Sequence, residues 1–207
     1  ARAYACLDFD EDLPVAWTHV ESGGGEARFD STRAVSGRSL RVSGEARSEA
    51  RYERVDIGNV SSGKVWVRMR VFVESGGADN AYFPILSLGQ RLTEPYAYFA
   101  LALAGGPGRI RTALSRGALG FVDASSEPDS FPTERWFCLE TEFDVAETTP
   151  IVTYLNGSEI SRFQAVTAGT FDRFHVGTDE AGTGQSARTV WLDDVVWSQL
   201  RVGCELE

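Results

Sequence analysis

The chain has 207 residues, of which 43% are hydrophobic, enough to bury one full core, and its net charge is -10. So acidic a balance excludes nucleic acid as a main partner, because phosphates require a basic surface. No apolar run is long enough to cross a bilayer, so membrane insertion is not expected. Twenty-one glycines, with many Thr, Val and aromatic residues, favour an all-β fold.

The ends of the chain suggest processing of the sequence. No signal-peptide pattern is present, and the first residue is Ala rather than Met, so we expect that an upstream segment was removed. Leu206-Glu207 is typical of a vector-derived tail, which leaves 1–205 as one expected domain. Lys64 is the only lysine among many arginines, a bias typical of a GC-rich bacterial gene.

The three cysteines allow one disulfide. Cys6 and Cys204 flank the first and last expected strands, and the termini of a β-sandwich commonly lie side by side. We therefore predict that these two are bonded and that Cys138 is a buried free thiol. A bridge across nearly the whole chain requires an oxidising compartment, which indicates an exported protein. The alternative is three reduced cysteines in a cytosolic protein.

The periodicity along the chain is that of strands. From Lys64 to Glu74 hydrophobic Val and Met residues alternate with Trp66, Arg68 and Arg70. Asn156-Gly157 is a strong hairpin signal, because both residues tolerate positive φ. Further strands are expected, in chain order, at 82–90, 95–104, 109–114, 136–145, 151–155, 159–163, 171–177 and 189–198. About a dozen strands with Gly-rich turns predict a two-sheet antiparallel β-sandwich, or jelly roll.

Short motifs give this prediction a family resemblance. They are Tyr154-Leu155-Asn156-Gly157, Phe174-His175-Val176-Gly177 and Trp191-Leu192-Asp193-Asp194-Val195. Together they resemble the concanavalin A-like lectin/glucanase superfamily, and laminin-G-like bacterial modules most of all. The edges also resemble an adhesion domain of the MAM type, through Cys6, Phe9-Asp10, Trp17, Asp30 ahead of Gly37, Asp194 and Cys204. This likeness implies fold rather than activity, since such folds carry enzymes, lectins and adhesion modules alike.

The resemblance implies a structural cation where the first and last strands meet. Ca²⁺ prefers hard oxygen ligands, and we expect it to be held by Asp10, Asp30 and Asp194. Asp8 and Asp193 are alternates. The competing interpretation is that Asp193 and Asp194 cap a turn or pair with arginines.

A second expected site is the solvent side of one sheet. If the valines of 64–74 face the core, then Trp66, Arg68 and Arg70 project outward. Aromatic faces stack on sugar rings, and arginine binds carboxylates or sulfates bidentately. Neighbouring strands would contribute Arg47, Glu49, Arg51, Tyr96, Tyr98, Glu140 and Glu142. We therefore predict a groove for an acidic polysaccharide, the alternative being a solvated face of Arg–Glu ladders.

Enzyme motifs match only in part. A retaining glucanase of the superfamily carries Glu-x-Asp-x-x-Glu, whereas Glu140-Thr141-Glu142-Phe143-Asp144 has the wrong order. The segment Arg47-Ser48-Glu49-Ala50-Arg51 resembles the Arg-Ser-Glu-x-Arg motif of alginate-lyase-type polysaccharide lyases. That family's later Gln-x-His is replaced here by Gln90-Arg91-Leu92, without the histidine.

The remaining candidates for chemistry are the two histidines. His175 lies in an expected strand and is interpreted as structural, with a groove-facing catalytic base as the alternative, whereas His19 carries no pattern. The sequence thus predicts an exported bacterial carbohydrate-binding or adhesion module, with a lyase acting on uronate-containing glycans as the alternative and a purely structural domain third.

Overall fold

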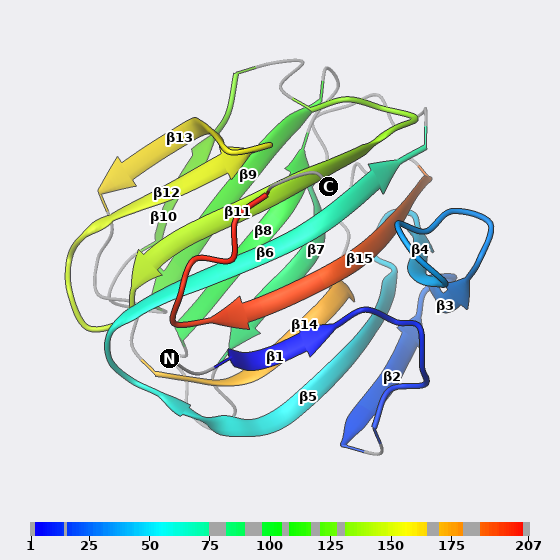
Figure 1. The fold of residues 1–207 in the computed structure, drawn as a ribbon, viewed down its shortest axis with the longest axis horizontal. Coiled ribbons are helices and arrows are strands. Elements are labelled where there is room, and N and C mark those ends of the chain that lie inside the picture. Colours follow the sequence, from blue (N-terminus) through cyan, green and yellow to red (C-terminus); the bar gives the residue numbers. More distant parts are fainter. Residues whose placement is uncertain are drawn as a thin grey trace.

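The structure is a computed structural model that describes residues 3–14, 16–74, 82–89, 97–104, 108–116, 121–127, 131–164, 170–179 and 187–204. Two antiparallel sheets lie face to face and form a β-sandwich, as predicted (Figure 1). Every regular element in these ranges is a strand, and none of their residues belongs to a helix that could cross a membrane.

The first sheet, called sheet A, holds eight strands and is nearer the viewer in Figure 1. In spatial order they are β13 (Ser158–Gln164), β12 (Pro150–Leu155), β11 (Trp136–Asp144), β6 (Lys64–Val73), β15 (Arg188–Ser198), β4 (Ser39–Gly44) and β3 (Glu26–Asp30), with β1 (Ala3–Leu7) also paired to β15. The pairing of β1 with β15 confirms that the first and last strands are neighbours.

The second sheet, called sheet B, holds seven strands and lies behind sheet A in the same view. In spatial order they are β10 (Phe121–Ser125), β9 (Arg109–Arg116), β8 (Ala97–Ala104), β7 (Tyr82–Gly89), β14 (Phe171–Thr178), β5 (Glu49–Val60) and β2 (Trp17–Ser22). The chain changes sheet between β5 and β6, at the turn of residues 61–63.

The core follows from the alternation of each strand. In β6 the residues Val65, Val67, Met69 and Val71 have no exposed surface, whereas Trp66 and the arginines between them are partly exposed. Apolar side chains of both sheets meet in one buried cluster. The turn at Asn156-Gly157 has φ of 48° and 82°, which is the left-handed conformation expected of this hairpin.

The disulfide joins Cys138 to Cys204, so the predicted pairing of Cys6 with Cys204 was wrong. The reason is the path of segment 199–204, called the tail, which leaves β15 and crosses β6 on the outer face of sheet A (Figure 1). Cys138 lies on that face of β11 and meets the tail, whereas Cys6 lies opposite Val196 and is exposed and free. A disulfide remains compatible with an oxidising compartment.

Candidate functional site

The residues of the predicted groove belong to two different sheets. Trp66, Arg68 and Arg70 lie on β6 of sheet A, whereas Arg51 and Tyr98 lie on β5 and β8 of sheet B. Placing them on one face was therefore wrong, because alternation gives the face of a residue within its strand but not the sheet to which the strand belongs.

Two members of that set need separate mention. Arg47 lies in the turn between β4 and β5, with a positive φ of 62°, and so belongs to neither sheet. Tyr96 lies outside the described residues, as do Gln90, Arg91 and Leu92 of the lyase comparison.

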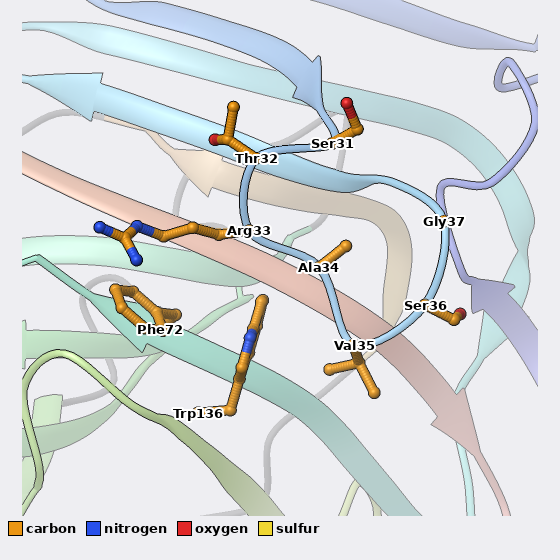
Figure 2. Close-up of a pocket in the computed structure, with 9 residues that line it drawn as sticks. All are labelled: Ser31, Thr32, Arg33, Ala34, Val35, Ser36, Gly37, Phe72 and Trp136. Carbon is orange, nitrogen blue, oxygen red and sulfur yellow. The ribbon is translucent and has the colours of Figure 1, made fainter.

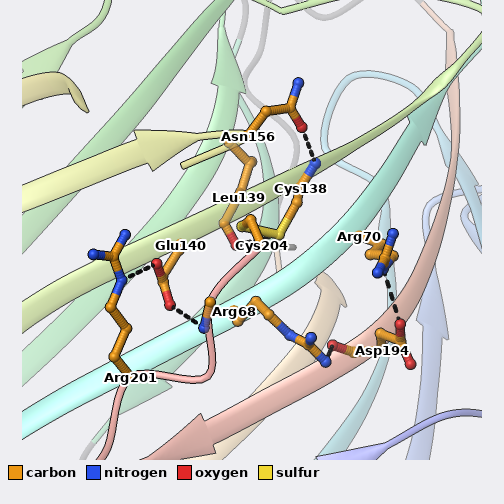
Figure 3. The surroundings of a disulfide bond; sticks show 10 residues. Arg68, Arg70, Cys138, Leu139, Glu140, Asn156, Asp194, Arg201 and Cys204 are labelled. Carbon is orange, nitrogen blue, oxygen red and sulfur yellow. Dashed lines mark hydrogen bonds and ion pairs between the residues drawn. A yellow bond between two sulfur atoms is a disulfide. The ribbon is translucent and has the colours of Figure 1, made fainter. Parts of the chain in front are cut away.

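On sheet A, the tail covers Trp66 of the predicted groove. Trp66 stacks on Tyr154 with ring centroids 6.2 Å apart, and the Arg201 guanidinium lies 5.2 Å and 4.6 Å from the two centroids. Arg201 Nε also lies 2.7 Å from the Glu140 carboxylate, which accepts the Gly203 N–H at 3.0 Å (Figure 3). Glu140 has no exposed surface. This part of the predicted groove is therefore occupied by the protein itself.

The two arginines of β6 are bound to β15. Arg68 donates to the carbonyl of Asp194 at 3.2 Å, and Arg70 Nε lies 3.0 Å from the Asp194 carboxylate (Figure 3). The side chains are mostly buried by this arrangement, so the arginines connect two strands of sheet A.

The predicted calcium ligands each have separate partners. Asp10 accepts the Arg38 N–H at 2.8 Å, Asp30 accepts the Thr32 N–H at 2.6 Å, and Asp194 pairs with Arg70. In the part of the chain that the structure describes, no three acidic, histidine or cysteine side chains are placed so that they could hold a metal ion together. Calcium therefore stays a prediction from the resemblance.

The alternate ligand Asp193 is buried beneath the loop of residues 31–37. Its carboxylate accepts the Val35 N–H at 2.9 Å and the Asp194 N–H at 2.8 Å. Burial raises the pKa of Asp193 to about 6; the two N–H groups oppose this shift, and the negative Asp194 and Asp10 add to it.

The outer face of sheet B holds a polar cluster that the sequence did not predict as a unit. One row of its register runs through Glu53 of β5, His175 of β14, Ser87 of β7 and Ala100 of β8. The residues beside this row along each strand, such as Phe174, lie in the core, so the row faces away from sheet A.

Asp179, just after β14, joins this row into a network. It contacts His175 Nδ1 at 2.7 Å, accepts the Tyr98 hydroxyl at 3.2 Å, and accepts a short hydrogen bond from Ser87. Arg51 Nε lies 3.5 Å from the same carboxylate. We call Arg51, Glu53, Ser87, Tyr98, His175 and Asp179 the Asp179 cluster.

Glu53 completes the cluster from the neighbouring strand. Its carboxylate lies 3.4 Å from Arg51 and 3.4 Å from His175 Nε2, the latter without hydrogen-bond alignment. The side chains of Glu53 and Asp179 are 19% and 18% exposed, so the cluster is recessed but reaches the surface at its rim. Glu49 also lies 3.3 Å from Arg51, so this one guanidinium faces three carboxylates and the cluster carries excess negative charge.

The electrostatics of the cluster keep Asp179 ionised and Tyr98 protonated. Burial opposes ionisation of Asp179, but the hydrogen bonds of His175 and Ser87 and the charge of Arg51 hold the pKa of Asp179 below its usual value. Burial, together with the charge of Asp179, raises the pKa of Tyr98 well above its usual value. Tyr98 is therefore a hydrogen-bond donor at neutral pH.

Comparison with solved structures identifies related folds. The chain matches the cellulose-induced protein Cip1 with a TM-score of 0.72 and 20% identity, over 97% of this chain and 100% of that one. It matches a carbohydrate esterase of the Shiga toxin-encoding bacteriophage phi24B with a TM-score of 0.63 and 17% identity, over 95% and 97%.

A third match is botulinum neurotoxin type C, whose cell entry depends on interaction with two ganglioside molecules. The TM-score is 0.61 and the identity 7%, over 90% of this chain and 44% of that one. No protein-family model and no curated sequence matches the chain. The likenesses confirm the predicted concanavalin A-like sandwich, and at such identities they show the fold alone.

Proposed function

We propose that the chain is an exported glycan-binding module that holds a polysaccharide at the Asp179 cluster. The observation that carries this proposal is a recessed, fully connected set of carboxylate, imidazole, hydroxyl and guanidinium groups on one sheet face. Such a network contributes little to stability, since desolvation of its charges offsets their attraction. Clustered donors and acceptors of this kind are what sugar hydroxyls require.

The names of the structural neighbours support the same class of ligand. Cip1 is described as cellulose-induced, the phage protein as a carbohydrate esterase, and the neurotoxin as a ganglioside binder. The excess of carboxylates around Arg51 favours neutral sugar units at the cluster itself.

A glycan array followed by calorimetry tests this proposal. Glu53→Gln removes a rim carboxylate of the cluster, and we expect it to weaken binding of the best array ligand by roughly tenfold, as loss of a charged hydrogen bond does. Glu26→Gln is the matched control, because Glu26 is an exposed carboxylate paired with arginines on sheet A. A protein that binds no glycan, or a Glu53→Gln variant that binds as wild type does, would contradict the proposal.

A second candidate function is a polysaccharide lyase, favoured by the contacts of one carboxylate with both His175 and Tyr98. In β-elimination a base takes the C5 proton of a uronate, the C4–O bond breaks, C4=C5 forms, and an acid protonates the leaving oxygen. His175 would be the base and Tyr98 the acid, since its raised pKa keeps its proton.

One observation speaks against this candidate. A lyase must bind the uronate carboxylate with a cation, but the Arg51 guanidinium is already paired with Glu49, Glu53 and Asp179. Incubation with alginate, glucuronan and ulvan, followed by absorbance of the unsaturated product, decides the matter. Product formation by wild type that Tyr98→Phe abolishes would establish the lyase, and no product from any of the three would exclude it for these substrates.

A further inference from the structure

Three aromatic side chains form a strip across the outer face of sheet A, on the opposite side of the molecule from the Asp179 cluster. The register places Trp136 of β11 beside Phe72 of β6, and Phe72 beside Trp191 of β15. The ring centroids are 5.8 Å apart for Trp136 and Phe72 and 5.6 Å apart for Phe72 and Trp191, both edge to face. We call these three residues the aromatic strip.

The loop of residues 31–37 forms a wall over this strip and brings Arg33 onto it. The Arg33 guanidinium lies 4.5 Å from the centroid of Phe72 and 5.2 Å from that of Trp191. Figure 2 shows the Arg33 side chain extending from the loop over Phe72, with the Trp136 ring beside it. The loop, Phe72 and Trp136 line a hollow of about 410 Å³ that is open to solvent.

The loop is held firmly from below. Val35 donates its N–H to Asp193, the Thr32 N–H and hydroxyl bind Asp30, and the Ser39 hydroxyl bonds to the carbonyl of Arg33. The position of the guanidinium is therefore set by backbone anchors and two ring faces, which lowers the entropy cost of ordering it around a ligand.

Within the described part of the chain, the charge of Arg33 is not neutralised by any carboxylate, and its guanidinium contacts only the rings of Phe72 and Trp191. Stacking uses the face of the guanidinium and leaves its N–H groups pointing outward in the plane. Among the residues that the structure describes, no carboxylate or carbonyl accepts a hydrogen bond from its side chain, whereas Arg28 and Arg41 nearby both pair with Glu26. With a net charge of -10 the surface as a whole repels anions, so a carboxylate would bind where a local cation is free.

We propose that this hollow binds a carboxylated sugar unit. Arg33 would bind the carboxylate bidentately, and Trp136 would stack on the sugar ring. The hydroxyls of Thr32 and Ser36 in the wall of the hollow donate to Asp30 and Asp10, so they would take part as acceptors from the ring hydroxyls. The ligand class rests on the proposed glycan function, but the site is separate from the Asp179 cluster. The two sites together would let one chain bind a mixed polymer of neutral and acidic units, or two polymers at once.

Titration with glucuronate and with its neutral counterpart glucuronamide tests the carboxylate, read by tryptophan fluorescence and calorimetry. We expect glucuronate to bind roughly tenfold tighter than glucuronamide, as a charge-assisted hydrogen bond predicts. Arg33→Gln should abolish that difference, and Trp136→Ala should weaken both ligands while thermal melting shows that each variant is folded. Arg28→Gln is the control, because Arg28 is an exposed arginine two strands beyond Trp191 in the same row.

The outcomes separate this site from the proposed function. Measurement in the Glu53→Gln background should leave glucuronate binding unchanged even where polymer binding at the Asp179 cluster is lost. Equal affinity of wild type and Arg33→Gln for glucuronate would overturn the proposal, as would no binding of glucuronate at all. Binding of benzoate as tight as that of glucuronate would also overturn it, because the site would then recognise an aromatic acid rather than a sugar.

Discussion

Arg201, from the segment after the last strand, pairs at 2.7 Å with Glu140, a carboxylate in the middle of sheet A that has no exposed surface. The same guanidinium lies over the rings of Trp66 and Tyr154. Glu140 is thus buried by the tail rather than by the sandwich core.

Loss of this pair should destabilise the protein. In Arg201→Ala, the Gly203 N–H is the one hydrogen bond that Glu140 keeps among the described residues. We expect the free energy of unfolding to fall by about 1–3 kcal/mol, the penalty of a weakly partnered buried group. Arg201→Lys, which keeps the charge, should lose less. Urea denaturation of the three proteins measures the difference, and equal midpoints would show that the Arg201–Glu140 pair contributes no stability.

Thiol chemistry should report one free cysteine. Under non-reducing, denaturing conditions we expect a single alkylated site, Cys6, and a peptide map with Cys138 linked to Cys204. The bridge closes a separation of 66 residues, which corresponds to a stabilisation of about 4 kcal/mol or less. An unlabelled Cys6, or labelling of all three cysteines, would contradict the structure and weaken the case for export.

Asp193 should make stability fall as pH rises. Because its pKa of about 6 in the folded protein lies above the ordinary value of 3.8, the stabilisation it gives is complete below about pH 4 and is lost as pH rises through 6. That loss is at most about 3 kcal/mol. The asparagine of Asp193→Asn does not titrate, so the free energy of unfolding of this variant should rise relative to that of wild type between pH 4 and 7. A difference that stays constant over this range would show that Asp193 has an ordinary pKa.

Trp66→Ala should change stability and leave glycan binding unaffected. Trp66 is stacked on Tyr154 under Arg201 rather than open to a ligand, so its removal should cost about 2 kcal/mol, less than a fully buried tryptophan. Chemical denaturation and calorimetry with the best array ligand measure the two effects. A folded Trp66→Ala protein that no longer binds glycan would place the binding surface on sheet A after all.

Calcium binding is a prediction from the family resemblance. A cation bound only by the folded chain raises stability by about 2.7 kcal/mol at a hundredfold excess over its Kd, so the Tm should rise with Ca²⁺ and fall with chelator. Asp10→Asn, at one of the expected ligands, should reduce the response. The same melting curve with and without Ca²⁺, and no metal by elemental analysis, would remove this prediction.

The alternation of single strands was readable from the sequence because burial follows a period of two. Val65 and Met69 face the core and Glu140 faces outward, as predicted. Sheet membership was not readable, because alternation within a strand does not say which sheet the strand joins, and the consecutive strands β5 and β6 belong to opposite sheets. The pairing of Cys138 was missed for a related reason: its position beside Glu140 puts it on the outer face, where burial requires a covering segment.

The Asp179 cluster was predicted only in part. Arg51 and Tyr98 were named as ligand residues and His175 as structural or catalytic, but nothing linked them. Asp179 follows its strand without a motif, and Ser87 stands in an apolar run. Their meeting depends on β14 lying between β5 and β7, a long-range order that no local pattern contains.

The exposed thiol of Cys6 offers a means of orienting the molecule. It lies on β1, at sheet A, and is the one unbonded cysteine of the chain. Maleimide coupling through this position would immobilise every copy in the same pose on a sensor surface, with sheet B toward the solution. Binding kinetics of long polymers could then be recorded from one defined orientation, and Lys64, the only lysine, would remain unmodified.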